Sequence, residues 1–192
     1  MIAMTIHEFS HGWVAYKLGD PTAKHSGRLT LNPLAHIDIF WTFLLPLFIF
    51  ISSGGRTIFG TAKPVPVNFW ALRNPKRDMV LVGAAGPLAN FILAFILSLV
   101  IKIPALHENI SFVLINLIVI NVVLGVFNLT PIPPLDGSRI LMGLLPRRIA
   151  AQYAMIEPFG FIILMAFVWL GIFGNLIWPI VELILKLLGI SS

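Results

Sequence analysis

Long apolar stretches alternate with short polar connections along the chain. Four windows contain no Asp, Glu, Lys or Arg, namely residues 39–55, 79–101, 109–135 and 158–181. A helix of about 20 apolar residues crosses the hydrocarbon core of a bilayer. The last three windows are therefore long enough to span a membrane. The first is shorter and contains Pro46, so we expect a kinked, tilted or interfacial segment there.

Three further elements are predicted outside these windows. Residues 1–18 are mostly apolar and precede Gly19-Asp20-Pro21, a sequence that ends a helix because proline cannot continue it. Residues 175–188 are predicted to form a shorter, amphipathic helix. Residues 57–67 lack a helical pattern, and Pro64 and Pro66 at a spacing of two are typical of an edge strand or an extended loop.

The composition indicates a membrane protein. The chain has 192 residues, of which 58% are hydrophobic and only 11% are charged, whereas a soluble domain carries about 25% charged residues. We therefore predict an all-α polytopic membrane protein with about 4 to 6 transmembrane helices and a short extended or β-like membrane-associated segment. Residues 1–192 are expected to form a single domain, because no internal repeat or linker interrupts the pattern.

The net charge of +5 fits a lipid surface rather than a nucleic acid. The 13 Lys and Arg lie almost wholly between the apolar windows, where anionic headgroups attract them. If residues 39–52 span the bilayer, residues 53–78 and 136–150 share one side, opposite residues 17–37 and 102–108. The first pair carries more Lys and Arg, which indicates a cytoplasmic location. The absence of cysteine excludes disulfides and thiol chemistry.

The first apolar helix contains the sequence His-Glu-Phe-Ser-His at residues 7–11. His7 and His11 are four residues apart, so on a helix both imidazoles lie on one face and can reach a single ion. Glu8 lies close enough to take a proton from a water at that ion. The alternative is a pair of solvated histidines at a helix end, and the apolar surroundings disfavour it because charge inside an apolar helix is costly.

A catalytic zinc site uses three protein ligands and a water, and Asp136 is the best candidate for the third ligand. It follows a proline-rich break at the end of the longest charge-free window. Irregular backbone at membrane depth is tolerated only where it is buried in protein or lines a watery cavity. His25, His36 and His107 are rivals in polar loops. His36 stays open as an alternative, because its loop begins near the metal-binding helix.

Small residues are concentrated in Gly-Ala-Ala-Gly-Pro-Leu-Ala-Asn at residues 83–90. Small residues let helices approach closely in lipid, so packing alone explains this run as well as a functional role does. Asn90 is harder to explain as packing. We expect it to contact the substrate or the oxyanion that forms during the reaction.

These segments, taken in order, resemble the site-2 protease family of intramembrane zinc metalloproteases, in its short form without a PDZ domain. Residues 7–11 match the first motif of that family, and Asn-Leu-Thr-Pro-Ile-Pro-Pro-Leu-Asp-Gly at residues 128–137 matches the second. Residues 31–38 and 86–90 also resemble family segments. The resemblance covers about residues 1–150. It implies His7, His11 and Asp136 as the ligands of one zinc ion per chain, with Glu8 as the catalytic base.

The sequence thus predicts an intramembrane zinc endopeptidase, a multi-pass protein of the cell membrane that cleaves in or near the transmembrane segments of other membrane proteins. The resemblance also implies that the region 57–67 helps to hold the substrate, and pairing along a strand edge is one way to do so. Two alternatives are a metal or proton transporter that uses the same His and Asp side chains and an inactive, zinc-bound scaffold. Only six residues precede His7, so the first helix is expected to be truncated at its start.

Overall fold

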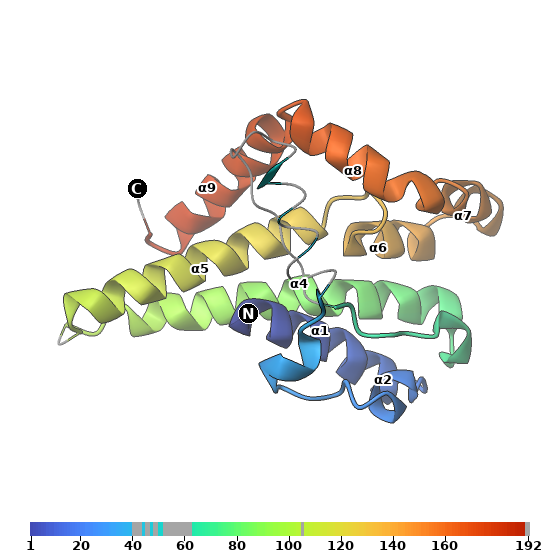
Figure 1. Ribbon diagram of the computed structural model, residues 1–192, viewed down its shortest axis with the longest axis horizontal. Coiled ribbons are helices and arrows are strands. Elements are labelled where there is room, and N and C mark those ends of the chain that lie inside the picture. The colour runs from blue at the N-terminus through green and yellow to red at the C-terminus, as the bar shows by residue number, and fades with distance from the viewer. Residues whose placement is uncertain (40–43, 45–46, 48–49, 52–62, 105, 191–192) are drawn as a thin grey trace.

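The computed structural model describes residues 1–39, 44, 47, 50–51, 63–104 and 106–190. All regular elements among these residues are helices, and none of these residues forms a strand (Figure 1). The longer helices are α1 (Ile2–Lys17), α4 (Pro75–Val100), α5 (Glu108–Asn128), α6 (Asp136–Leu144), α7 (Arg147–Ala154), α8 (Gly160–Trp169) and α9 (Trp178–Leu187). Short elements between them are α2 (Thr22–His25), η1 (Pro33–His36), η3 (Phe69–Ala71), η4 (Glu157–Phe159) and η5 (Phe173–Ile177).

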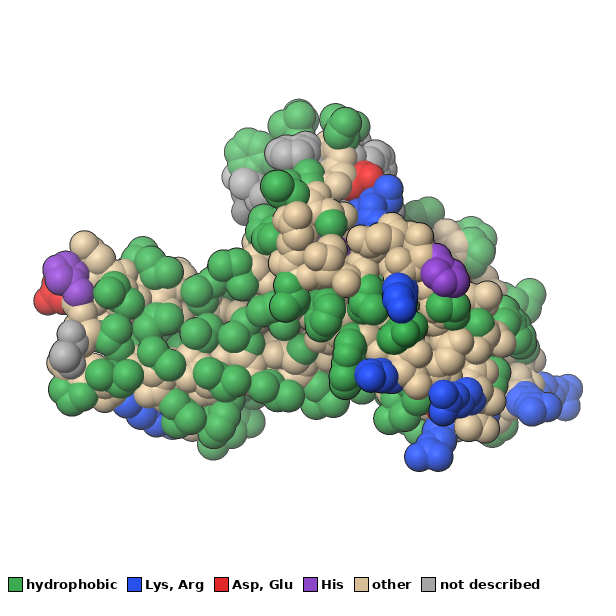
Figure 2. Space-filling view, turned by 90° about the horizontal axis from the view of Figure 1, so that it is seen from below, with side chains coloured by type: hydrophobic (Ala, Val, Ile, Leu, Met, Phe, Trp, Pro, Cys, Tyr) green, Lys and Arg blue, Asp and Glu red, His purple; other side chains and the backbone are tan. Residues whose placement is uncertain are grey.

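Three stretches are long and apolar enough to cross a membrane, namely Pro75–Val100, Glu108–Asn128 and Arg147–Phe167. The prediction of an all-helical membrane protein is therefore confirmed. Helices α4 and α5 form an antiparallel hairpin (Figure 1), and hydrophobic side chains cover its surface in the space-filling view (Figure 2). Phe95 and Phe112 on this hairpin are 54% and 69% exposed, as expected for side chains that face lipid rather than water.

The apolar core of the molecule lies between α4, α5 and α9. Ala94, Ile118, Val122 and Val181 are completely buried in it. Gly125 allows the close approach of α5 to α4, because a Cβ atom at that position would lie 2.7 Å from the ring of Phe91. The hairpin therefore depends on a small residue at its contact, as is usual for helices that pack in lipid.

A break in the chain divides α5 from α6 and places Asp136. Helix α5 ends at Asn128, and the prolines at 131, 133 and 134 prevent its continuation. Helix α6 begins at Asp136 and runs along the first part of α4, where its backbone approaches Gly83. Gly137 is required at this turn, since a Cβ atom there would lie 2.5 Å from the carbonyl oxygen of Thr130. The break thus fixes Asp136 beside α4.

The polar segments on either side of residues 39–62 lie together at one end of the bundle. The Arg73 N–H donates to the Leu18 carbonyl at 3.0 Å, and the Asn68 N–H donates to Asp20 Oδ2 at 2.7 Å. The expectation that residues 17–37 and 53–78 lie on opposite sides is therefore wrong for the described part, residues 63–78. It assumed a single crossing between them, and no local pattern reveals such long-range hydrogen bonds.

Two predicted segments fall largely outside the described residues. These are the apolar segment 39–52, of which residues 39, 44, 47 and 50–51 are described, and residues 57–62 of the predicted extended segment. The rest of that extended segment, residues 63–67, is described. It has neither helix nor strand and runs beside α1.

Basic side chains gather at the end of the bundle where α1 ends and α4 begins (Figure 2). The end defined by these segments carries Lys17, Lys24, Arg28, Lys63, Arg73, Lys76 and Arg77. Lys102 lies at the opposite end, in the turn between α4 and α5, next to Gly189 after α9. Because Lys and Arg are enriched in cytoplasmic loops, we expect the basic end to face the cytoplasm.

Single-cysteine variants test this orientation directly, because the natural chain contains no cysteine. Ser26 is exposed at the basic end, and Asn109 is exposed at the opposite end. A membrane-impermeant maleimide added to intact cells is expected to label Asn109→Cys, and to label Ser26→Cys only after permeabilisation. Labelling of Ser26→Cys in intact cells would show that the basic end faces outward.

Candidate metal centre

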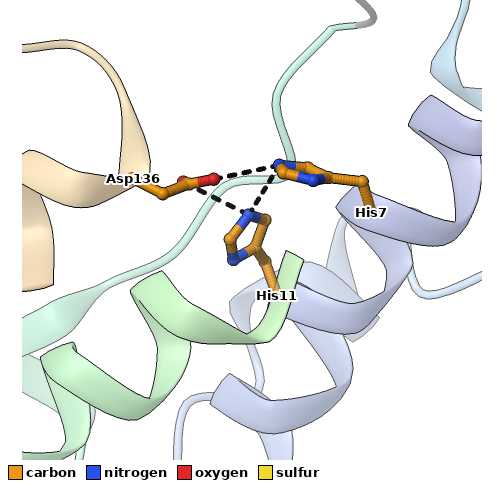
Figure 3. Close-up of side chains that lie close together, drawn as sticks. All are labelled: His7, His11 and Asp136. Atoms are coloured by element: carbon orange, nitrogen blue, oxygen red, sulfur yellow. Dashed lines mark hydrogen bonds and ion pairs between the residues drawn. The ribbon is translucent and has the colours of Figure 1, made fainter. Parts of the chain in front are cut away.

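His7, His11 and Asp136 come together where α1, α4 and α6 meet (Figure 3). The two histidine Nε2 atoms lie 3.0 Å apart. The Asp136 carboxylate oxygens lie 3.0 Å from Nε2 of His7 and 3.2 Å from Nε2 of His11. A metal held tetrahedrally at about 2.0–2.1 Å keeps its ligand atoms about 3.3 Å apart. The spacing of the three side chains therefore fits three corners of such a site.

The hydrogen bonds on the far side of each imidazole identify the Nε2 atoms as acceptors. Nδ1 of His11 lies 2.6 Å from the carbonyl oxygen of Val82, which can only accept, so Nδ1 carries the hydrogen. Nδ1 of His7 lies 2.6 Å from Oδ1 of Asn90 and donates in the same way. Two nitrogen lone pairs and a carboxylate consequently face one another. Asp136 Oδ2 is also buried without a hydrogen-bond donor, and a cation suits such a group of acceptors.

Gly86 of α4 provides the space in which the two imidazoles lie. A Cβ atom at this position would lie 2.6 Å from Cε1 and 2.7 Å from Nε2 of His7, and nearer still to Nε2 of His11. Real Cβ atoms essentially never come within 3.0 Å of another heavy atom. The sequence left packing and function as equal explanations for the small residues at 83–90, and at Gly86 the close neighbours are the candidate ligands themselves.

The cluster is nearer to one end of the bundle than to the other. His11 contacts Val82, which lies about 10 Å along α4 from Pro75 and about 27 Å from Val100 at 1.5 Å per residue. Pro75 is the first residue of α4 and lies at the basic end. The candidate metal centre therefore lies within the apolar length of α4 and is displaced towards the basic end.

Glu8 faces a cavity of about 400 Å³ that His7, His11 and Asp136 also line. Its Oε2 atom accepts a hydrogen bond of 2.8 Å from the backbone N–H of Val65, in the extended segment 63–67. Apolar side chains of α5 and α8 form much of the remaining wall, namely Leu124, Phe127, Phe161 and Leu164. A carboxylate outside the three-residue cluster thus shares a mostly apolar cavity with it.

Asn90 occupies a different place from the one that the sequence suggested. Its side chain is completely buried and does not line the cavity. The amide nitrogen donates to the carbonyl oxygen of Ala3 at 3.2 Å and to Oδ1 of Asn121 at 2.8 Å, while its oxygen accepts from His7. Asn90 therefore binds the Nδ1 side of the His7 ring, opposite Nε2. We had expected it to contact the substrate or an oxyanion.

The three rival histidines lie away from the cluster. His36 is completely buried in η1, with Nε2 2.9 Å from the carbonyl oxygen of Thr30. His25 is exposed in α2, and His107 caps the start of α5 by accepting the backbone N–H of Asn109. Among the residues that the structure describes, the group with metal-ligand geometry is His7, His11 and Asp136.

Sequence reasoning missed three groups that contact the site. Val82 and Val65 contribute a backbone carbonyl and a backbone N–H, which no pattern of side chains marks. Asn121 had a visible signal, since it is a lone polar residue within Ile-Val-Ile-Asn-Val-Val at residues 118–123. A polar side chain inside a membrane helix usually has a partner in the bundle.

Apolar spans around two buried histidines and a partly buried aspartate define a class, that of membrane proteins with a candidate metal site in the helical core. Comparison with known families identifies the group within that class. The model of peptidase family M50 matches residues 1–105 and 100–170. The chain belongs to this family, the site-2 protease family, and is a zinc metalloprotease. The resemblance inferred from the two sequence motifs is confirmed.

Individual relatives give the same result. The chain is 38% identical to YwhC of Bacillus subtilis, over 95% of this chain and 83% of YwhC. It is 32% identical to Rip2 of Mycobacterium tuberculosis, over 73% of this chain and 53% of Rip2. It is 28% identical to the zinc metalloprotease MJ0392 of Methanocaldococcus jannaschii, over 77% of this chain and 33% of that protein. The match thus spans only about half of Rip2. No solved structure matches the chain.

The space at Gly86 yields a specific prediction. Gly86→Ala is expected to lower zinc affinity by more than about 10-fold, because the added methyl group displaces both imidazoles. Zinc affinity is measured by competition with a chromophoric chelator. Gly174→Ala is the matched control, since a Cβ atom at that position meets nothing within 4 Å. Equal zinc affinity of Gly86→Ala and the natural protein would contradict this account of Gly86.

Proposed function

We propose that the chain is an intramembrane zinc endopeptidase that hydrolyses peptide bonds in or near the transmembrane segments of membrane proteins. The observation that carries this proposal is the shared cavity, in which a His-His-Asp cluster and a separate glutamate meet beside membrane-length helices. Membership of a zinc metalloprotease family supports the hydrolytic chemistry. In this proposal residues 1–192 act as one transmembrane domain of a multi-pass protein in the cell membrane.

His7, His11 and Asp136 are the proposed ligands of one zinc ion per chain. Two neutral imidazoles and a carboxylate are ligand types that zinc accepts, and three protein ligands leave a fourth position for water. The Nδ1 contacts with Asn90 and Val82 support this role, because they orient the rings and direct the Nε2 lone pairs towards Asp136. Bound zinc supplies a positive charge that activates water near neutral pH and polarises the scissile carbonyl.

Glu8 is the proposed catalytic base. It takes a proton from the attacking water and later donates it to the leaving amine. The Val65 N–H supports this role, because it holds one oxygen of the carboxylate at the cavity wall. Pro64 and Pro66 flank Val65, and the fixed φ angle of proline limits the movement of that N–H group. The extended segment therefore positions the base.

A membrane-spanning substrate must unwind before it is cut, since a peptide carbonyl inside a helix is engaged and its flanks are crowded. The proposed place for the unwound strand lies beside residues 63–67. The extended backbone of this segment supports pairing with another strand. Pro64 and Pro66 have no N–H and the Val65 N–H donates to Glu8, so pairing would use carbonyl oxygens of the segment. The mostly apolar cavity wall is compatible with the side chains of a transmembrane segment.

Two other functions use the same residues in different ways. A metal or proton transporter needs intramembrane His and Asp groups, but it has no evident use for a glutamate that lies beside the cluster and outside it. An inactive scaffold retains zinc without cutting. Family membership favours the protease over both, and substitution of Glu8 separates the three.

Glu8→Gln keeps the size of the side chain and removes its basicity. Zinc is expected to stay bound at one ion per chain, while cleavage of a membrane-embedded peptide falls by about 10²-fold or more, the scale of a lost general base. His7→Ala is expected to lose both zinc and cleavage, because two ligands hold the ion poorly. The measurement is zinc per chain and peptide-bond hydrolysis in liposomes. Glu8→Gln with natural turnover would refute the assigned base, and a natural protein that moves ions without cutting would favour the transporter.

The third ligand has its own test. Asp136→Ala is expected to lose zinc on dialysis, because its carboxylate faces both Nε2 atoms. His36→Ala is expected to keep one zinc per chain, since His36 contacts Thr30 and lies outside the cluster. The opposite pattern, with zinc retained by Asp136→Ala and lost by His36→Ala, would make His36 the ligand.

A further inference from the structure

A chain of hydrogen bonds leads from His7 through two buried asparagines to the backbone of α5. Oδ1 of Asn90 accepts from Nδ1 of His7, and Nδ2 of Asn90 donates to Oδ1 of Asn121. Nδ2 of Asn121 donates to the carbonyl oxygen of Leu117 at 2.8 Å. Both asparagines are completely buried. This series of hydrogen bonds therefore joins α1, α4 and α5 in a region with little water.

Backbone carbonyls fix the direction of every hydrogen bond in the series from His7 to Leu117. Leu117 O can only accept, so Nδ2 of Asn121 must face it, and Oδ1 of Asn121 then faces Asn90. Ala3 O also accepts only, which gives a second reason for Nδ2 of Asn90 to point away from His7. Reversal of the Asn90 amide would place oxygen against oxygen at Ala3 and at Asn121, and unpaired buried polar groups are costly.

The orientation of Asn90 determines which nitrogen of His7 carries the hydrogen. In the observed orientation Nδ1 donates to Asn90, and Nε2 presents a lone pair to Asp136 and His11. With Asn90 reversed, its amide nitrogen would donate to Nδ1, and the hydrogen of His7 would move to Nε2. That tautomer can hydrogen-bond to Asp136 but cannot ligate a metal, because the lone pair of Nε2 is lost.

We propose that Asn121 is a positioning residue that acts through Asn90 to hold His7 in the tautomer able to bind a metal. The inference rests on the proposed role of His7 as a zinc ligand. It assigns a function to a residue that does not line the cavity and that touches neither the substrate nor the metal. Ala3 lies one turn before His7 on α1. Asn90 therefore hydrogen-bonds both to the ring of His7 and to the backbone of the preceding helical turn.

A simpler role for Asn121 is that of a polar contact between α4 and α5, since asparagine commonly joins helices in membranes. The two roles differ in what they change. A contact between helices contributes to folding and is indifferent to the tautomer of His7. A positioning role changes the zinc affinity and the protonation pattern of His7 in protein that is still folded.

Zinc affinity of four variants separates these roles. Asn121→Leu keeps the approximate volume and is expected to weaken zinc binding by about 10-fold, while Asn90→Ala weakens it by about 10- to 100-fold. The double variant is expected to bind zinc no more weakly than Asn90→Ala, because Asn121 acts only through Asn90. Asn116→Leu is the matched control and stays within about twofold of the natural protein. Asn116 also donates to its own helix four residues back, at 2.8 Å, but it is exposed and unconnected to His7.

The tautomer is measured by nitrogen NMR of histidine-labelled, metal-free protein. The natural protein is expected to show His7 protonated at Nδ1, and Asn121→Leu is expected to show a mixture with the Nε2–H form. Asn121→Ala serves as a second variant if Asn121→Leu does not fold. Natural His7 protonated at Nε2 would overturn the inference, as would additive losses of zinc affinity in the double variant.

These outcomes are distinguishable from failure of the proposed function. If the natural protein binds one zinc and cleaves while Asn121→Leu binds zinc equally tightly, only the inference about Asn121 fails. If the natural protein binds no zinc, the proposed function fails, and the inference fails with it because it rests on that function.

Discussion

The central constraint on this structure is that polar groups buried among apolar helices must satisfy one another. Two imidazoles and a carboxylate meet with their acceptor atoms facing inward, an arrangement that a bound cation stabilises and that is otherwise costly. Gly86 leaves room for the rings, and hydrogen bonds to Val82 and Asn90 orient them. The break before α6 places Asp136 beside the two histidines. The surrounding helices are arranged so that these few contacts can form.

Much of the fold could be predicted, because membrane helices leave a local signal. The apolar windows gave α4 and the start of α5 to within a few residues, and Gly19-Asp20-Pro21 marked the end of α1. The proline-rich break marked the end of α5 in the same way. The pairing of His7 with His11 also followed from helical spacing alone, and the expectation that Asp136 would join them rested on where irregular backbone is tolerated in a membrane.

What could not be predicted depends on contacts between distant segments. The placement of residues 18–38 against 63–73 rests on backbone hydrogen bonds such as Arg73 to Leu18. Asn90 was recognised as unusual, but its hydrogen bond to Nδ1 of His7 was not foreseen, since a sequence cannot show whether an amide faces a cavity or the far side of a ligand. The contribution of Val82 is a carbonyl oxygen that any residue provides. In each case the identity of the partner comes from the fold.

Under the proposed function, the unequal position of the cluster along α4 also bears on the fate of the cleavage products. A spanning segment that lies alongside α4 and is cut at the level of Val82 is divided into one piece of about seven residues and another of about eighteen. The shorter piece falls far below the roughly 17 residues that a spanning helix needs, whereas the longer piece is near that lower limit. The shorter piece buries far less apolar surface and leaves the lipid first, at the basic end. In the proposed function, the depth of the site would thus determine which half of a cut protein is released and which half stays anchored.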